Sequence, residues 1–153
     1  MRRWAELRSG EFEEADKASL FLPMGSVEPH GPHLPMNTDT IIASAMAEEL
    51  SRRTNGIVMP PIEYAHLYGL RDYAGGISAS HEAQIGLLLD IFRSAERWGG
   101  KVLSIINGHT PSEPLARISQ EKWIGEGHGM RVLLFTYPGI YSTCDMEEDY
   151  VDF

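Results

Sequence analysis

One stretch of the chain gathers the residue types that bind divalent metal ions. An apolar run at residues 20–24 predicts a strand, and the segment after it carries Glu28, His30, His33 and Asp39. Glu28 and His30 are two positions apart, so in extended backbone their side chains project to the same side. Asp39 falls in the first turn of the next predicted helix, where the helix dipole favours a carboxylate. Carboxylates and imidazoles spaced this closely suit a borderline ion such as Zn2+ or Mn2+.

His109 is the distant residue that could complete such a site. It follows the continuous apolar run at 101–106, which is typical of a buried parallel strand. If this strand lies beside the first one, their carboxyl ends meet, and Glu28, Asp39 and His109 converge. Structural alternatives remain for these residues: Asp39 could only cap its helix, and His109 could only pack against the start of the next helix.

The rest of the sequence alternates predicted strands with predicted helices. Strands are predicted at 19–24, 57–62, 101–106 and 131–137, and helices within 1–18 and at 38–53, 81–98 and 112–124. This alternation predicts a single α/β domain of three layers, with a mostly parallel sheet flanked by helices in a Rossmann-like arrangement. No Gly-x-Gly-x-x-Gly follows the first strand, which argues against a dinucleotide binder.

Side-chain patterns predict how two of the helices pack and where two of them begin. The helix at 38–53 has apolar residues on one face at helical spacing: Ile41, Ile42, Ala45, Met46 and Leu50. The helix at 81–98 has a stripe that we expect to be buried: Ile85, Leu88, Leu89 and Phe92. Ser80 and Ser112 are predicted to be the N-caps of the second and third long helices.

The histidines fall mainly at one edge of the predicted sheet. In a parallel α/β fold, ligands bind beyond the carboxyl ends of the strands. Five of the six histidines lie in segments that leave strands: His30, His33, His66, His81 and His109. His128 follows a helix and belongs to the opposite edge, so Glu126-x-His128-Gly is predicted to be a helix-ending turn although it resembles the first motif.

Two motifs resemble those of the creatininase family of metal-dependent amidohydrolases. The string GSVEPHGPHLPMNTD at residues 25–39 is similar to the family's signature, with Pro29 where members often have Gln, and Asn-Gly-His at 107–109 resembles its second motif. The resemblance implies the family's three-layer α/β fold. It also implies a hydrolase that cleaves a non-peptide C–N bond of a small cyclic amide or formamide through a metal-activated water.

The same resemblance implies a set of metal ligands. Glu28, Asp39 and His109 would hold one ion, and His30 and Asp39 a second, with the Asp39 carboxylate bridging the two. His33 would orient a ligand or contact the substrate. The ions implied are Zn2+ and/or Mn2+, with Fe2+ as a further option, at one or two per chain.

The family pattern is interrupted after His109. Members supply a further Glu to the second ion, two positions after this histidine or from a later His-Ala-Gly-Glu motif, whereas position 111 here is Pro and no such motif follows. Three explanations compete. The chain is an incomplete member, which we favour; the second ion is absent; or another carboxylate serves, from the set Glu113, Asp145, Glu147 and Glu148. A different class of function is also open, namely a catalytically silent metal-binding or assembly module.

The composition limits the classes of partner that we expect for this protein. A net charge of −9, from 13 basic and 22 acidic residues, argues against nucleic-acid binding. Cys144 is the single cysteine, so no intrachain disulfide can form, and no apolar run is long enough to cross a membrane. We therefore expect a cytoplasmic protein with a small-molecule substrate. The resemblance, together with the open edge of a partial sheet, also predicts a homo-oligomer.

Overall fold

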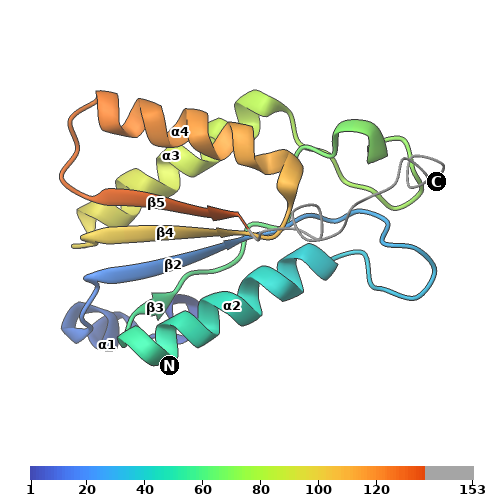
Figure 1. The fold of residues 1–153 in the computed structure, drawn as a ribbon. Coiled ribbons are helices and arrows are strands. Elements are labelled where there is room, and N and C mark those ends of the chain that lie inside the picture. The colour runs from blue at the N-terminus through green and yellow to red at the C-terminus, as the bar shows by residue number, and fades with distance from the viewer. Residues whose placement is uncertain (137–153) are drawn as a thin grey trace.

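A parallel sheet between two layers of helices forms the body of the protein. The computed structural model describes residues 1–136, and its five strands have the order β1-β3-β2-β4-β5. The strands are β1 Arg2–Arg3, β2 Ser19–Met24, β3 Ile57–Val58, β4 Val102–Asn107 and β5 Arg131–Thr136. The α-helices are α1 Ser9–Glu14, α2 Thr38–Thr54, α3 His81–Arg97 and α4 Glu113–Gly125. Helices α3 and α4 cover one face, and α1 and α2 lie on the other (Figure 1). The three-layer parallel α/β prediction is confirmed.

The register of the two central strands places their carboxyl ends together. Strand β2 pairs with β4 in parallel from Ser19 opposite Val102 to Met24 opposite Asn107. Gly108, the residue after β4, donates its backbone N–H to the carbonyl of Met24 over 2.8 Å. The loops that carry Glu28 and His109 therefore start from the same point of the sheet edge.

Both faces of these strands are buried, as their continuous apolar sequences predict. Leu20, Leu22 and Met24 face the layer of α3 and α4, where Phe92 and Trp123 are also fully buried. On the opposite face a smaller cluster forms between the sheet and α2: Phe21, Ala43, Ala47, Val58 and Ile106. The site-bearing edge thus rests on a core that fixes both strands.

One predicted strand and one predicted helix differ in detail from the observed elements. The strand predicted at 57–62 is shorter, because Pro60 and Pro61 have no N–H to donate, and β3 ends at Val58. Beyond it, Met59 donates its N–H to the carbonyl of Phe21 over 2.8 Å, and Ile62 forms an isolated bridge with Met24. Helix α2 buries only part of the apolar face that its sequence shows, since Met46 and Leu50 are half-buried against the core but the first residues of that face are exposed. Ile41 and Ile42 are 50% and 38% exposed. The side chains that face inward are small or polar: Asp39, Thr40, Ala43, Ala47 and Ser51.

The amino-terminal segment contains more than the predicted leading helix. Strand β1, a 3-10 turn (η1, Trp4–Glu6) and α1 precede β2. Lys17 stabilises the carboxyl-terminal end of α1, because its Nζ donates to the carbonyls of Phe12 and Ala15 over 2.6 and 2.8 Å. Among residues 1–136, no helix is long and apolar enough to cross a membrane.

Candidate metal centre

Two glycines allow α2 to begin directly against the ends of β2 and β4. A Cβ on Gly25 would lie 2.3 Å from the backbone N of Thr40, and one on Gly108 would lie 2.3 Å from the carbonyl oxygen of Asp39. No side chain fits at either position without moving the helix. The glycines of both sequence motifs therefore serve to place Asp39 over the strand ends.

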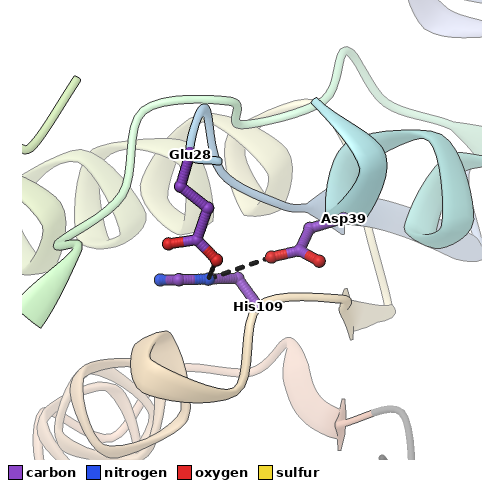
Figure 2. A group of neighbouring side chains, drawn as sticks. All are labelled: Glu28, Asp39 and His109. Carbon is purple, nitrogen blue, oxygen red and sulfur yellow. Dashed lines mark hydrogen bonds and ion pairs between the residues drawn. The ribbon is translucent and has the colours of Figure 1, made fainter. Parts of the chain in front are cut away.

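Glu28, Asp39 and His109 meet at this edge of the sheet. Figure 2 shows their side chains pointing toward one another from the loop after β2, the first turn of α2 and the turn after β4. Nδ1 of His109 lies 3.2 Å from Glu28 Oε1 and 3.0 Å from Asp39 Oδ2. The three residues are 7%, 9% and 1% exposed, and one ligand atom from each lies within 4.8 Å of the others.

The position of the His109 ring protons follows from its second contact. Nε2 lies 3.1 Å from the carbonyl oxygen of His66, which can only accept, so Nε2 carries a hydrogen. In the neutral ring Nδ1 then has a lone pair that faces the oxygens of two carboxylates. Burial alone would lower the pKa of His109, but in the metal-free protein hydrogen bonds with Asp39 and Glu28 raise it to about 9. The arrangement requires a cation at Nδ1, either a proton or a metal ion.

His30 repeats this arrangement on the other oxygen of Asp39. Its Nδ1 lies 3.0 Å from the carbonyl oxygen of Glu28, and its Nε2 lies 3.0 Å from Asp39 Oδ1. The carbonyl requires a hydrogen on Nδ1, so in the neutral ring the Nε2 lone pair faces the carboxylate. Asp39 thus presents Oδ2 to His109 and Oδ1 to His30, which is the orientation of a carboxylate that bridges two cations.

The carboxylates themselves are suited to a positive charge. Burial opposes ionisation of Asp39, but hydrogen bonds from His109 and from Ser26, whose hydroxyl donates over 2.9 Å, lower its pKa. Oε2 of Glu28 is buried and has no hydrogen-bond partner among the described residues. A buried carboxylate oxygen without a donor is costly unless a cation compensates it. The residues present therefore fit a divalent ion.

The family of the chain follows from its match to a protein-family model. The model of the creatininase family, described as creatinine amidohydrolase, matches residues 5–150. The chain belongs to the creatininase family.

Relatives of known name match over parts of their length. A mycofactocin precursor peptide peptidase of Mycobacterium ulcerans is 39% identical over 100 residues, covering 60% of this chain and 40% of the relative. A creatinine amidohydrolase of Pseudomonas putida is 28% identical over 156 residues, covering 97% of this chain and 57% of the relative. The chain thus spans about half the length of these relatives.

Solved creatininases share the fold. A structure described as creatininase Mn matches with a TM-score of 0.79 over 92% of this chain and 62% of that chain, at 24% identity. A mutant creatininase of Zn-Zn type matches with a TM-score of 0.78 over the same shares, at 23% identity. At these identities the likeness supports the architecture alone.

His33 lies apart from the group that surrounds Asp39. Its side chain is exposed, and it makes no hydrogen bond or ion pair within residues 1–136. The nearest atoms to a Cβ built on Gly31 are those of the His33 ring, which stays close to its own loop. Within the described residues His33 therefore does not orient any of the candidate metal-binding side chains. Its exposed ring is accessible to a small molecule that approaches from solvent.

The further carboxylate of the family pattern has no counterpart in the part of the chain that the structure describes. Pro111 stands in the 3-10 turn between His109 and α4 (η3, Thr110–Ser112). Glu113, the first residue of α4, accepts a hydrogen bond over 2.8 Å from Nε of Arg117 in the next turn of the same helix. The other candidates, Asp145, Glu147 and Glu148, lie outside the described residues, as do Tyr137 and Cys144.

Two residues that the sequence did not indicate as members of the site also support the centre. Asn107 is fully buried, and its Oδ1 accepts the backbone N–H of His109 over 3.1 Å, which fixes the turn after β4. Gln84 is 1% exposed, and its Oε1 accepts the backbone N–H of His66 over 3.0 Å. The signal for Gln84 was present in the sequence, because a polar residue occupies the same face of α3 as Leu88, one turn later.

Proposed function

We propose that this creatininase-family chain is a metal-dependent hydrolase of a C–N bond in a small cyclic amide or formamide. The observation that carries the proposal is the pair of imidazoles, His30 and His109, whose lone pairs are aimed at opposite oxygens of one buried carboxylate. Backbone carbonyls fix both ring orientations. Such a preformed set of ligands is expected of a metal centre and would be unfavourable without cations.

The chain's own residues would divide the work as follows. Glu28, Asp39 and His109 would hold one ion, and His30 together with Asp39 would hold a second. A divalent ion bound there would lower the pKa of a water ligand and polarise the amide carbonyl of the substrate. The burial of Glu28, Asp39 and His109 keeps solvent away from these side chains, which strengthens their electrostatic effect on a bound ion. Zn2+ or Mn2+ suits this donor set of nitrogen and carboxylate oxygen, and Fe2+ is a third candidate.

His33 is proposed as a substrate contact. It follows His30 in the same loop, and its exposed imidazole can donate to or accept from a small polar molecule. A His33→Ala variant that retains wild-type metal content but has a raised KM would support this role.

Replacement of the ligands tests the proposal directly. Glu28→Ala and His30→Ala should each reduce the metal retained after gel filtration, measured by elemental analysis, and abolish turnover in an amidase screen. His128→Ala, at the opposite edge of the sheet, is the matched control and should keep wild-type metal content. The substrate panel should include creatinine, formamides and a short peptide amide, because the relatives include a peptidase. Unchanged metal content in both ligand variants would refute the assignment.

A second candidate function has its own supporting observation. Among the described residues no further carboxylate faces His30, and Pro111 replaces the position that supplies one in the family. A catalytically silent metal-binding or assembly module would fit this deficit. Metal stoichiometry separates the two: two ions per chain with turnover supports the hydrolase, and one or no ion without turnover supports the module. Self-association into a homo-oligomer remains a prediction for either function, measurable by light scattering.

A further inference from the structure

A buried amide on α3 is connected to the candidate metal centre through the backbone of His66. Gln84 lies one turn inside α3 and is 1% exposed. Its Oε1 accepts the N–H of His66 over 3.0 Å, and the carbonyl of the same residue accepts Nε2–H of His109 over 3.1 Å. The two contacts flank the His66 Cα, so Gln84 and His109 hold opposite sides of one residue.

The neighbouring peptide groups are fixed as well. The carbonyl of Ala65, in the same peptide plane as the His66 N–H, accepts the N–H of Ala79 over 2.9 Å. The N–H of Leu67, in the same plane as the His66 carbonyl, donates to Ser78 Oγ over 3.1 Å. Gln84, Ala79 and Ser78 thus all restrain the orientation of the His66 carbonyl, which faces His109.

We propose that Gln84 is a positioning residue for the metal centre: it holds the His66 backbone so that the His66 carbonyl keeps a hydrogen on Nε2 of His109. Nδ1 of His109 is then left to bind an ion beside Glu28 and Asp39. This role rests on the proposed metal-binding function for its consequence, but the contact itself can be measured in the metal-free protein.

The chemical character of Gln84 fits this role better than a role in packing. Among residues 1–136 its Nε2 has only a weak acceptor, Met24 Sδ at 3.8 Å, so within this part of the chain the amide's one strong hydrogen bond is with His66. Burying a polar side chain among apolar residues costs free energy unless a hydrogen bond compensates the loss of water. For Gln84 that compensating bond is the one to the His66 N–H. An apolar residue here would leave the His66 N–H unsatisfied, and the segment would be free to rotate away from His109.

Gln84→Met tests the assignment with a side chain of similar length. We expect the affinity for Zn2+, measured by competition with a chelator, to fall about tenfold, at the lower end of the range for groups that orient a metal ligand. The Nε2–H proton of His109, followed by NMR in the metal-free protein, should exchange faster with solvent than in the wild type. Ser78→Ala, an exposed position where folding is not in question, should shift both measurements in the same direction by a smaller factor.

Ser80→Ala provides a control for a merely structural effect. It removes the hydrogen bond from the N–H of Ala83 that caps α3, so it should lower the unfolding midpoint but leave Zn2+ affinity and Nε2–H exchange unchanged. The proposal is overturned if Gln84→Met keeps the wild-type exchange rate, or if Ser80→Ala changes it as much. If the wild-type chain binds no Zn2+, the hydrolase proposal fails, and the exchange rates still decide the role of Gln84. If Gln84→Met does not fold, Ser78→Ala decides by the same two measurements.

Discussion

At the scale of single residues, a metal ion at the proposed centre would compete with a proton for Nδ1 of His109. Hydrogen bonds with two carboxylates outweigh burial and raise the pKa of His109 to about 9 in the metal-free protein, so at neutral pH an ion bound there would have to displace that proton. We expect the apparent Zn2+ affinity to rise about tenfold per pH unit between pH 7 and 9 and to level off above the pKa. Chelator competition at several pH values measures this slope. An affinity that does not change over this range would show that the ion does not replace a proton there.

The sequence predicts the main residues of the centre because their chemistry lies in side chains. Glu28, Asp39 and His109 were selected by type and by position after strands, and the structure brings them together. The carbonyl of His66 leaves no such signal, since every residue has one, so its contact with His109 could not be foreseen. Ser112 stands at the N-cap position of α4, as predicted, but its side chain accepts no capping hydrogen bond, because η3 leads directly into α4. Ser112 has a helical rather than an extended backbone, and its buried Oγ has no partner among the described residues.

At the scale of elements, close packing overrides the apolar pattern of α2. The helix begins so near the strand ends that only small side chains fit beneath it, and Ala43 and Ala47 are fully buried there. The larger Ile41 and Ile42 are turned outward. Hydrophobic spacing alone predicts which face is apolar, but the distance to the neighbouring layer decides which face can be buried.

The turn after β4 offers a sharp test of this close packing. Gly108→Ala places a Cβ 2.3 Å from the carbonyl oxygen of Asp39, so the start of α2 must move. We expect a loss of about 1–3 kcal/mol in the free energy of unfolding and a weaker metal affinity, because Asp39 moves with the helix. Chemical denaturation and Zn2+ titration measure the two effects.

Gly86→Ala is the matched control for that substitution. Apart from the adjacent backbone of its own helix, no atom of the described residues lies within 4 Å of a Cβ built on Gly86, and the residue is in the interior of α3. The same chemical change should therefore stabilise the protein by roughly 0.5–1 kcal/mol and leave metal binding unchanged. Equal effects of the two substitutions would contradict the role of Gly108 in seating α2.

At the scale of the whole molecule, strand order is what the sequence leaves open. The alternation of strands and helices predicts a parallel sheet, but convergence of the ligands depends on β2 and β4 being neighbours. In the structure β2 and β4 pair from Ser19 opposite Val102 to Met24 opposite Asn107. Side chains of the flanking helices pack against both faces of this pair. Such contacts join residues far apart in the chain, so periodicity within one element cannot encode them.

At the opposite edge of the sheet, His128 lies between an aromatic ring and two carboxylates. The His128 ring stacks on Trp123 at 3.4 Å, its Nδ1 lies 2.8 Å from Glu96 Oε2, and its Nε2 lies 3.0 Å from Glu126 Oε2. Glu96 also accepts the backbone N–H groups of Gly129 and Met130. One imidazole thus ties the ends of α3 and α4 to the start of β5, and Arg93 adds a positive charge 3.7 Å from Glu126.

This contact makes stability depend on pH in a defined direction. Hydrogen bonding to Glu126 and then Glu96, opposed by burial, raises the pKa of His128 above its ordinary value of 6.5. A raised pKa in the folded state contributes stability that is fully present below pH 6.5 and is lost as pH rises through the folded value. The difference in unfolding free energy between wild type and His128→Gln should therefore be largest near pH 6 and shrink toward pH 9. Urea denaturation of both proteins at each pH isolates the effect, since the His109 contribution is common to both. A difference that is constant across this range would mean that His128 contributes through its stacking on Trp123 rather than through its charge.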